Sequence, residues 1–316
     1  MKKWVKGTAI VLALMGLSMK SAYAIDTTTV NEKWGKPTVV YGGGLSEAQI
    51  KQTSELLGIK DANTVLTETA TGQDLIKYLG SGDGDTSVMI SSVMVQKTDK
   101  GTGVKVNIKT PENITLVTAE QYANAAITAG VTDAEIEVAA VSKVTGESAL
   151  TGVYKAFEAN GVQLDTKRTE VAQQELEVTN KIAQENANAN GFDSSKLDQA
   201  MIEIKKELAE LKEKQGQLAT KEDIERIINE ALKNNSLQNV ISQDQINSLV
   251  AFAQNYQNTS AIDSKQVLEQ LNSLSQSVGE KINNLVEQAK NEGWLDKIAQ
   301  FFQSIFDAIK NLFSQN

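Results

Sequence analysis

The chain contains neither cysteine nor histidine among its 316 residues. Without cysteine, no disulfide can support the fold and no lipoprotein anchor can be attached through an acylated cysteine. Without histidine, Ser-His-Asp and Cys-His catalysis are excluded, together with zinc sites that need histidine or cysteine ligands. Catalysis by paired carboxylates, by a Ser-Lys pair or by tyrosine stays open, and we expect no cofactor.

Aromatic side chains and positive charge are also scarce. Aromatic residues make up 5% of the chain, and after residue 24 the tryptophans are Trp34 and Trp294. This scarcity disfavours a glycan hydrolase with aromatic sugar platforms. The 31 basic residues are outnumbered by 40 acidic ones, which gives a net charge of −9. Such an acidic chain does not neutralise phosphates, so we expect no nucleic-acid partner.

A short hydrophobic run lies close to the N-terminus. Three lysines in the first six residues precede the apolar stretch TAIVLALMGL at 8–17, and Ala22 and Ala24 are the small residues of a cleavage site. This pattern predicts a secretory signal at 1–24, cleaved after Ala24, and therefore a secreted protein, extracellular or associated with the cell surface. A retained anchor is the alternative, but this run is shorter than the roughly 20 residues that a bilayer requires.

Residues 25–162 mix strand-like and helix-like segments, which predicts an α+β (mixed α/β) domain. The strand candidates are rich in Val, Ile and Thr: 38–41, 64–68, 87–96, 103–109, 115–117 and 135–142. The helix candidates are 46–57, 72–79, 119–129 and 147–159. The glycine-containing segment at 98–103, between two strand candidates, predicts a hairpin turn.

This domain contains a weak internal duplication. The segment SEAQIKQTSELLGIKDA at 46–62 aligns with TAEQYANAAITAGVTDA at 118–134, and a Thr-Gly pair follows each segment, at 71–72 and at 145–146. Each copy would be a helix-strand-helix unit whose first helix begins at a Ser or Thr N-cap and ends at a glycine. Two unrelated sets of similar helix signals are the alternative interpretation.

Residues 163–290 have few strand signals and no proline, which predicts an all-α helical region. One apolar seam repeats with alternating gaps of four and three, with Gln215 in the one position that is not apolar: Leu197, Met201, Ile204, Leu208, Leu211 and Leu218. Three more helices would begin at Thr220, at Ser242 and at either Asp263 or Ser264, and the segment 185–195 would be a linker. We expect an antiparallel bundle, with self-association through an exposed coiled-coil seam as the alternative.

The sequence pattern of residues 291–316 predicts an amphipathic aromatic helix. One face collects ten large apolar side chains: Trp294, Leu295, Ile298, Phe301, Phe302, Ile305, Phe306, Ile309, Leu312 and Phe313. This face could dock on the bundle, lie on a membrane surface, or bind a partner or a second copy. The charges on the opposite face balance, so the helix lacks the cationic bias typical of helices on anionic lipid. We therefore favour docking on the bundle.

Two loops contain residues of the types that bind ligands. Tyr41-Gly-Gly-Gly-Leu45 follows a strand candidate and precedes a helix candidate, as phosphate-binding loops do, but a P-loop lysine and hydroxyl do not follow. We interpret it as a turn made flexible by glycine. Asp83 and Asp85 are weak calcium ligand candidates, but the EF-hand pattern is absent. We otherwise expect no metal site.

Four acidic residues could form carboxylate pairs for hydrolysis. Glu135 and Glu137 would share one side of a strand, Glu147 would begin the helix that follows, and Asp74 would occupy the equivalent place in the other copy. Ordinary surface acids on an acidic protein explain these residues more simply. We therefore assign no catalytic or cofactor-binding residue.

Four segments resemble a known family. WGKPTVVYGGGLSEAQI at 34–50, GDGDTSVMISSVMV at 82–95, VTGESALTGVYKAFEANG at 144–161 and ATKEDIERIINEAL at 219–232 are similar to the YpuA-like secreted proteins of Gram-positive bacteria, a family of domains of unknown function. The resemblance covers roughly residues 25–285. It implies an exported protein of uncharacterised role and supplies no catalytic residues.

These observations predict a secreted, non-catalytic protein associated with the cell envelope, which acts by binding or by structural association. Its partner would be a membrane surface, a cell-wall component or a second copy. An envelope hydrolase that uses carboxylates is one alternative, and a protein that interacts with membranes through its C-terminal helix is the other.

Overall fold

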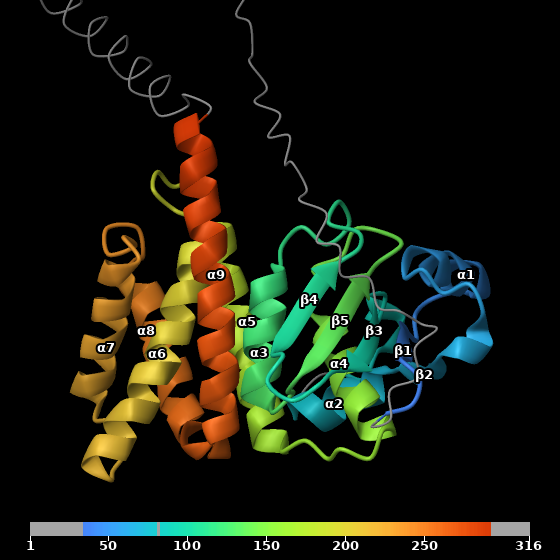
Figure 1. The fold of residues 1–316 in the computed structure, drawn as a ribbon, viewed down its shortest axis with the longest axis horizontal. Helices are drawn as coiled ribbons and strands as arrows, with labels where there is room; N and C mark the ends of the chain where they lie inside the picture. The colour runs from blue at the N-terminus through green and yellow to red at the C-terminus, as the bar shows by residue number, and fades with distance from the viewer. Residues whose placement is uncertain (1–33, 81–82, 292–316) are drawn as a thin grey trace, which may run out of the picture.

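The computed structural model describes residues 34–80 and 83–291. The chain forms a five-stranded mixed sheet with helices, followed by a helical region that packs against the β4 side of the sheet (Figure 1). This arrangement confirms the predicted fold class. The predicted signal at 1–24 and nearly all of the predicted C-terminal helix lie outside the described residues.

The sheet has the strand order β2-β1-β3-β5-β4. Strand β3 runs antiparallel to both of its neighbours, whereas β1 and β2 are parallel, as are β4 and β5. The strands are β1 (Thr38–Gly42), β2 (Leu66–Ala70), β3 (Ser92–Lys97), β4 (Val104–Ile108) and β5 (Ala134–Ala139). Strands β2 and β4 are therefore the two edges of the described sheet.

Three details of the predicted strands and their connections are wrong. The segment 98–103 connects β3 to β4, but these strands do not form a hairpin, because β5 pairs with β3 on one side and with β4 on the other. Residues 115–117 form no strand, and the start of the segment 87–96 belongs to a short 3₁₀ turn at Thr86–Val88. Local patterning marks extended segments but does not say which strands become neighbours.

In the described part of the chain, four helices cover the two faces of the sheet. Helix α1 (Glu47–Leu56) packs on the face that carries Val39 and Met94. The opposite face packs against three helices: α2 (Gly72–Leu79), α3 (Ala119–Ala129) and α4 (Ser148–Ala159). Strands β1, β2, β4 and β5 all run parallel, and the β1-α1-β2 and β4-α3-β5 crossovers both move in the same direction along the strand order. Their helices α1 and α3, however, lie on opposite faces of the sheet. They therefore have opposite hands.

The proposed duplication has local support in the caps. Ser46 and Thr118 both form capping boxes with a glutamine three residues later, and Gly58 and Gly130 both have positive φ, at 74° and 103°. The opposite hands of the two crossovers show that this local likeness does not extend to the packing. Common ancestry of the two copies stays a prediction.

Five helices form the described region between residues 163 and 291. Their predicted starts are confirmed at Thr220 and Ser242, which form capping boxes, and at Ser264, whose hydroxyl accepts a bond from Val267 N at 3.2 Å. The helices are α5 (Thr166–Asn186), α6 (Ser194–Gln215), α7 (Lys221–Asn234), α8 (Gln243–Gln257) and α9 (Lys265–Asn291).

The seam along α6 is shorter than predicted. Its first four members, Leu197 to Leu208, are buried at 0–1% exposure. Leu218 lies beyond the helix and is 38% exposed, because Gly216 ends α6 in the left-handed conformation at φ 71°. The seam packs within the chain, where α6 contacts α7 and α9 most closely.

One hydrophobic core joins the sheet to the helical region. A continuous cluster of buried side chains extends from Val40 in β1 to Val278 in α9. Within it lies a buried ion pair between Lys205 on α6 and Glu175 on α5, with Nζ to Oε1 at 2.7 Å. Lys205 also donates to Asn124 Oδ1 on α3 at 2.5 Å, so the charged cluster links three helices. Across the described residues, no helix is both long enough and apolar enough to span a bilayer.

Candidate binding site at the edge of strand β4

A hollow of the described structure lies around the edge strand β4. We call it the β4 groove, a cavity of about 390 Å³. It is lined by β4 and the residues before it, by part of β5, and by α3 and α9: Thr102–Asn107, Glu135–Glu137, Ala119, Glu120, Ala123, Ser273, Leu274, Ser277 and Glu280. Cavities of this size accommodate small ligands or a few residues of a peptide.

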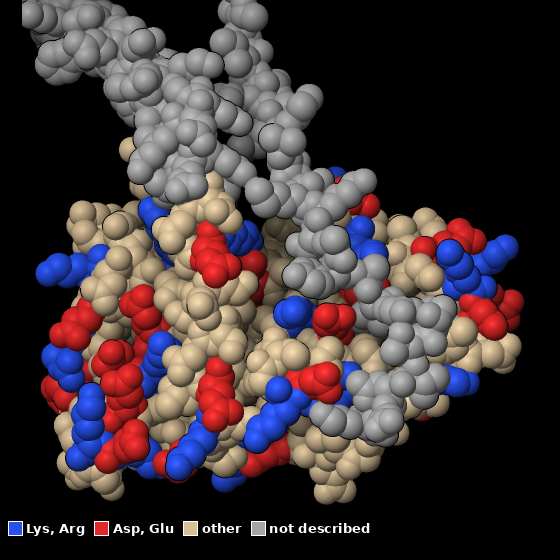
Figure 2. Space-filling view, in the orientation of Figure 1, with Lys and Arg blue, Asp and Glu red and all other residues tan. Residues whose placement is uncertain are grey.

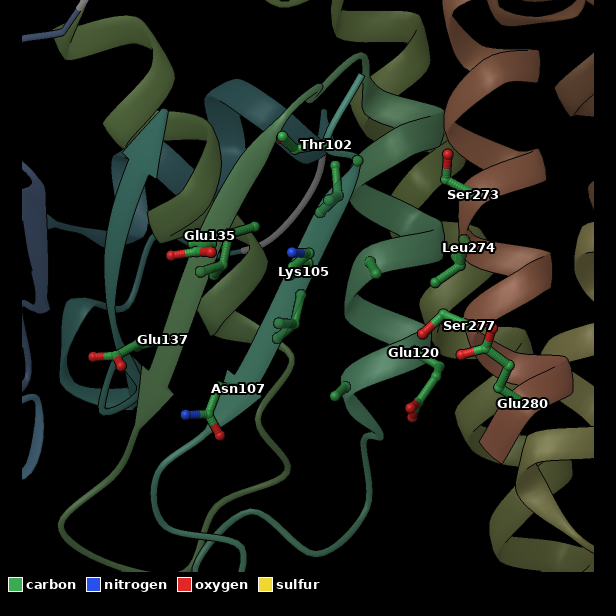
Figure 3. A pocket seen from close by; sticks show the side chains of 16 residues that line it. Thr102, Lys105, Asn107, Glu120, Glu135, Glu137, Ser273, Leu274, Ser277 and Glu280 are labelled. Carbon is green, nitrogen blue, oxygen red and sulfur yellow. The ribbon is translucent and has the colours of Figure 1, made fainter. Parts of the chain in front are cut away.

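The groove has two differently lined sides. Glu135, Glu137 and Asn107 point to the side of the sheet away from α3 and α9, whereas Glu120 and Glu280 lie on the helical side (Figure 3). The alternation of side chains along β4 and β5 produces this division. A ligand in the groove would therefore contact a polar strand face and a helical wall at the same time.

The backbone of β4 contributes its own hydrogen-bonding groups. Gly103 O accepts a bond from Ala134 N at 3.1 Å, and Lys109 N donates to Val138 O at 2.7 Å. Successive backbone groups of a strand alternate in direction. The odd-numbered residues of β4 therefore face β5, and the even-numbered ones direct N–H and C=O to the open edge: Val104, Val106 and Ile108.

Two of the groove glutamates have nearby lysines. Lys281 Nζ lies 2.9 Å from Glu120 Oε1, and Lys109 Nζ lies 3.4 Å from Glu137 Oε1. Among the described residues, neither Glu135 nor Glu280 takes part in an ion pair. On the face shown in Figure 2, acidic and basic side chains are mixed without a continuous basic patch.

A buried carboxyl group lies behind the helical wall. Asp198 on α6 is 1% exposed, and its Oδ2 accepts a bond from Thr118 Oγ1 at 3.0 Å. Burial, and secondly the charge of Glu120, raises the pKa of Asp198 well above its usual range. A general acid must reach the proton it transfers, and Asp198 does not line the groove. Asp198 therefore has the position of a structural group, and it does not support the alternative of an envelope hydrolase.

The four acids predicted as possible pairs are divided among separate places. Glu135 and Glu137 are brought together in the β4 groove. Glu147 lines a second cavity of about 370 Å³ between α2, α4 and α5, where Asn180 Nδ2 donates to it at 3.2 Å. Asp74 caps α2 and pairs with Lys155 at 2.7 Å. Burial opposes ionisation of Asp74, but the bonds from Lys155 and Thr71 outweigh it and lower its pKa.

The two predicted loops have structural roles. Asp83 Oδ1 accepts a bond from Asp85 N, and Asp85 Oδ1 accepts one from Ser87 N, at 3.0 and 2.8 Å. The hydrogen bonds from Ser87 lower the pKa of Asp85. Throughout the described residues, no group of three or more acids is arranged to hold a metal ion. Calcium binding stays an untested prediction.

The glycines after β1 are required by close packing, whereas we predicted that they supply flexibility. A Cβ on Gly42 would lie 2.2 Å from Met89 O, and one on Gly44 would lie 2.4 Å from Ser87 O. Gly43 N and Gly44 N donate to Ala70 O and Met89 O, so both amides are already bonded within the protein.

The predicted aromatic face at 294–313 lies outside the described residues. Reasoning from sequence found Glu135 and Glu137 but missed the rest of the β4 groove, including Asn107, Ser277 and Glu280. The alternating segment VKVNIK at 104–109 marked a strand with one polar face. It did not show that the strand is an edge or that α9 lies beside it.

Comparison with known proteins identifies the family. Residues 41–274 match the family described as "Protein of unknown function (DUF1002)", which is more than half of the chain. The chain belongs to this family. The Uncharacterized protein YpuA of Bacillus subtilis (strain 168) is 32% identical over 286 residues, which cover 88% of this chain and 90% of that protein. No solved structure matches the chain. The DUF1002 match includes β4, β5 and α3, and therefore most of the groove.

Proposed function

We propose that this DUF1002 protein is an exported, non-catalytic binding protein of the cell envelope, and that the β4 groove is its ligand site. The observation that carries the proposal is the edge of β4, where outward backbone groups and a polar cavity of about 390 Å³ occur together. Export is supported by the signal pattern at 1–24. Binding without catalysis is supported by the absence of cysteine and histidine and by the fact that the buried Asp198 does not line the groove.

Co-sedimentation with isolated Gram-positive cell envelopes tests this function. The protein used begins at Ile25, and sequencing the N-terminus of exported protein checks that processing site. Ser277 lines the groove from α9 and is exposed. Ser277→Trp should fill the groove and weaken binding by about ten-fold, as expected when a ligand loses roughly 1.4 kcal/mol of contact energy.

Gln276→Trp is the matched control, because Gln276 is the exposed neighbour on the same helix and does not line the groove. It should bind as the unchanged protein does. Equal binding by Ser277→Trp, or release of soluble fragments from the envelopes by the unchanged protein, would contradict the proposal.

A further inference from the structure

We propose that the β4 groove binds an extended, positively charged peptide segment of another protein, which adds to the sheet as a sixth strand beside β4. This proposal rests on the groove being the ligand site. It follows from the backbone geometry of the edge, from the residues on each side of it, and from its charge.

The edge offers the hydrogen bonds that a further strand requires. The N–H and C=O groups of Val104, Val106 and Ile108 point away from β5. Among the described residues, no backbone hydrogen bond is made to these groups from the open side. An extended peptide can pair with such a row, and main-chain bonds then supply affinity while alternate side chains supply specificity.

The two sides of the groove select an alternating side-chain pattern. On the helical side, an added strand would meet the small or apolar residues Ala119, Ala123 and Leu274, together with Glu120 and Glu280. On the other side, it would lie beside the polar face with Lys105 and Asn107, and with Glu135 on the neighbouring strand. Side chains of a strand point alternately to opposite faces, so the peptide should alternate apolar and polar residues.

The charge of the groove favours a basic peptide. Its lining contains Glu120, Glu135, Glu137 and Glu280 but one lysine, Lys105. Lys281 and Lys109 pair with two of these glutamates, while Glu135 and Glu280 take part in no ion pair within the described residues. A lysine or arginine side chain on the peptide would supply the missing cations.

Charge also argues for another protein as the occupant. The terminal segments outside the described structure are not basic: residues 25–33 contain Asp26, Glu32 and Lys33, and residues 292–316 contain three acids and two lysines. After loss of four signal lysines, the chain would have 27 basic and 40 acidic residues, so a second copy would be repelled.

Fluorescence anisotropy with labelled hexapeptides tests the proposal on the chain that begins at Ile25. The probe is a hexapeptide of alternating lysine and valine. In one comparison peptide, glutamate replaces each lysine. A second comparison peptide keeps the lysines but is N-methylated at every other residue, so that the N–H groups that would face β4 are blocked. Loss of about three hydrogen bonds should weaken the N-methylated peptide by about ten-fold or more. The glutamate peptide should be weakened similarly, and lysine peptide binding should fall with added salt.

A backbone variant isolates the edge. Val106 N–H faces outward, so Val106→Pro removes a donor to the peptide while the bonds to β5 stay in place. Val106→Ala keeps the donor and controls for the lost side chain. We expect Val106→Pro to lower affinity about ten-fold relative to Val106→Ala, with equal far-UV circular dichroism for both proteins.

The outcomes separate this proposal from the proposed function. Equal binding of the N-methylated and plain lysine peptides would overturn strand addition. Strand addition would also be overturned if neither the plain nor the N-methylated lysine peptide binds. If Ser277→Trp still weakens envelope binding in that case, the groove remains the ligand site. Binding that appears only after deletion of residues 25–33 would show that the chain's own segment occupies the edge, and would overturn a separate partner.

Discussion

At the scale of single residues, the interior contains charged side chains whose burial cannot be recognised in the sequence. Lys205 stands between Ile204 and Lys206 in a helix rich in charge, and pattern alone places it at the surface. Its side chain is 0% exposed because α6 is surrounded by α3, α5, α7, α8 and α9. Burial lowers the pKa of Lys205, and the charge of Glu175 opposes this effect. Such burial depends on which helices meet, so no local pattern predicts it.

Asp198 gives a residue-scale prediction for stability against pH. Its pKa is raised in the folded state, so the folded protein holds a proton that the unfolded chain releases near its ordinary pKa of about 3.9. The contribution of Asp198 to the stability of the parent protein should therefore fall as pH rises from about 4 towards the folded pKa. Asp198→Asn cannot ionise and should be more stable at pH 7, by about 1 kcal/mol or more. Urea unfolding at pH 4 to 8 measures the difference.

Glu207→Gln on the same helix is the control, because Glu207 is exposed. Its effect on the free energy of unfolding should stay within about 0.5 kcal/mol at every pH. If the gap between Asp198→Asn and the parent does not widen as pH rises, Asp198 is ionised in the folded protein and our assignment is wrong.

At the scale of elements, helix starts were the most predictable feature. Ser46, Thr118, Thr220 and Ser242 each precede a glutamine or aspartate by three residues, and each forms the capping box that this spacing indicates. Strand neighbours were not predictable, because β3 and β4 follow one another in the chain while β5 separates them in the sheet. The β4 groove depends on that rearrangement and on the position of α9.

Two glycines at contrasting places test the packing interpretation. A Cβ on Gly42 would lie 2.2 Å from Met89 O, so Gly42→Ala should force the backbone apart and destabilise the protein by about 1–3 kcal/mol. Gly279 in α9 has no atom within 4 Å of the added Cβ, so Gly279→Ala should stabilise by about 0.5–1 kcal/mol. The midpoint of urea unfolding reports both changes, and an unchanged Gly42→Ala protein would show that flexibility was the correct interpretation.

At the scale of the whole molecule, the sheet and the helical region share one core. Composition changes sharply near residue 163, which predicted separate regions, but buried side chains from both sides belong to a single cluster. The Lys205 cluster crosses the same boundary through Asn124. Sequence patterns define each amphipathic face, but they do not specify which faces pack together.

A shared core predicts one cooperative unfolding transition. Trp34 packs edge-on against Phe157, with ring centroids 4.7 Å apart, and reports on the sheet. In a Trp294→Phe background it is the one tryptophan of the chain beginning at Ile25. Its fluorescence and far-UV circular dichroism should give the same urea midpoint. Two midpoints would show that the helical region unfolds independently of the sheet.

The strand order also determines when the sheet can be completed during synthesis. Strand β4 leaves the ribosome before α3 and β5, yet β5 is the described strand with which it pairs. Until Ala139 has emerged, β3 lacks one of its two described neighbours and β4 lacks the described strand with which it pairs. The last strand made is inserted between two earlier ones, so the sheet cannot grow by adding strands in the order of translation.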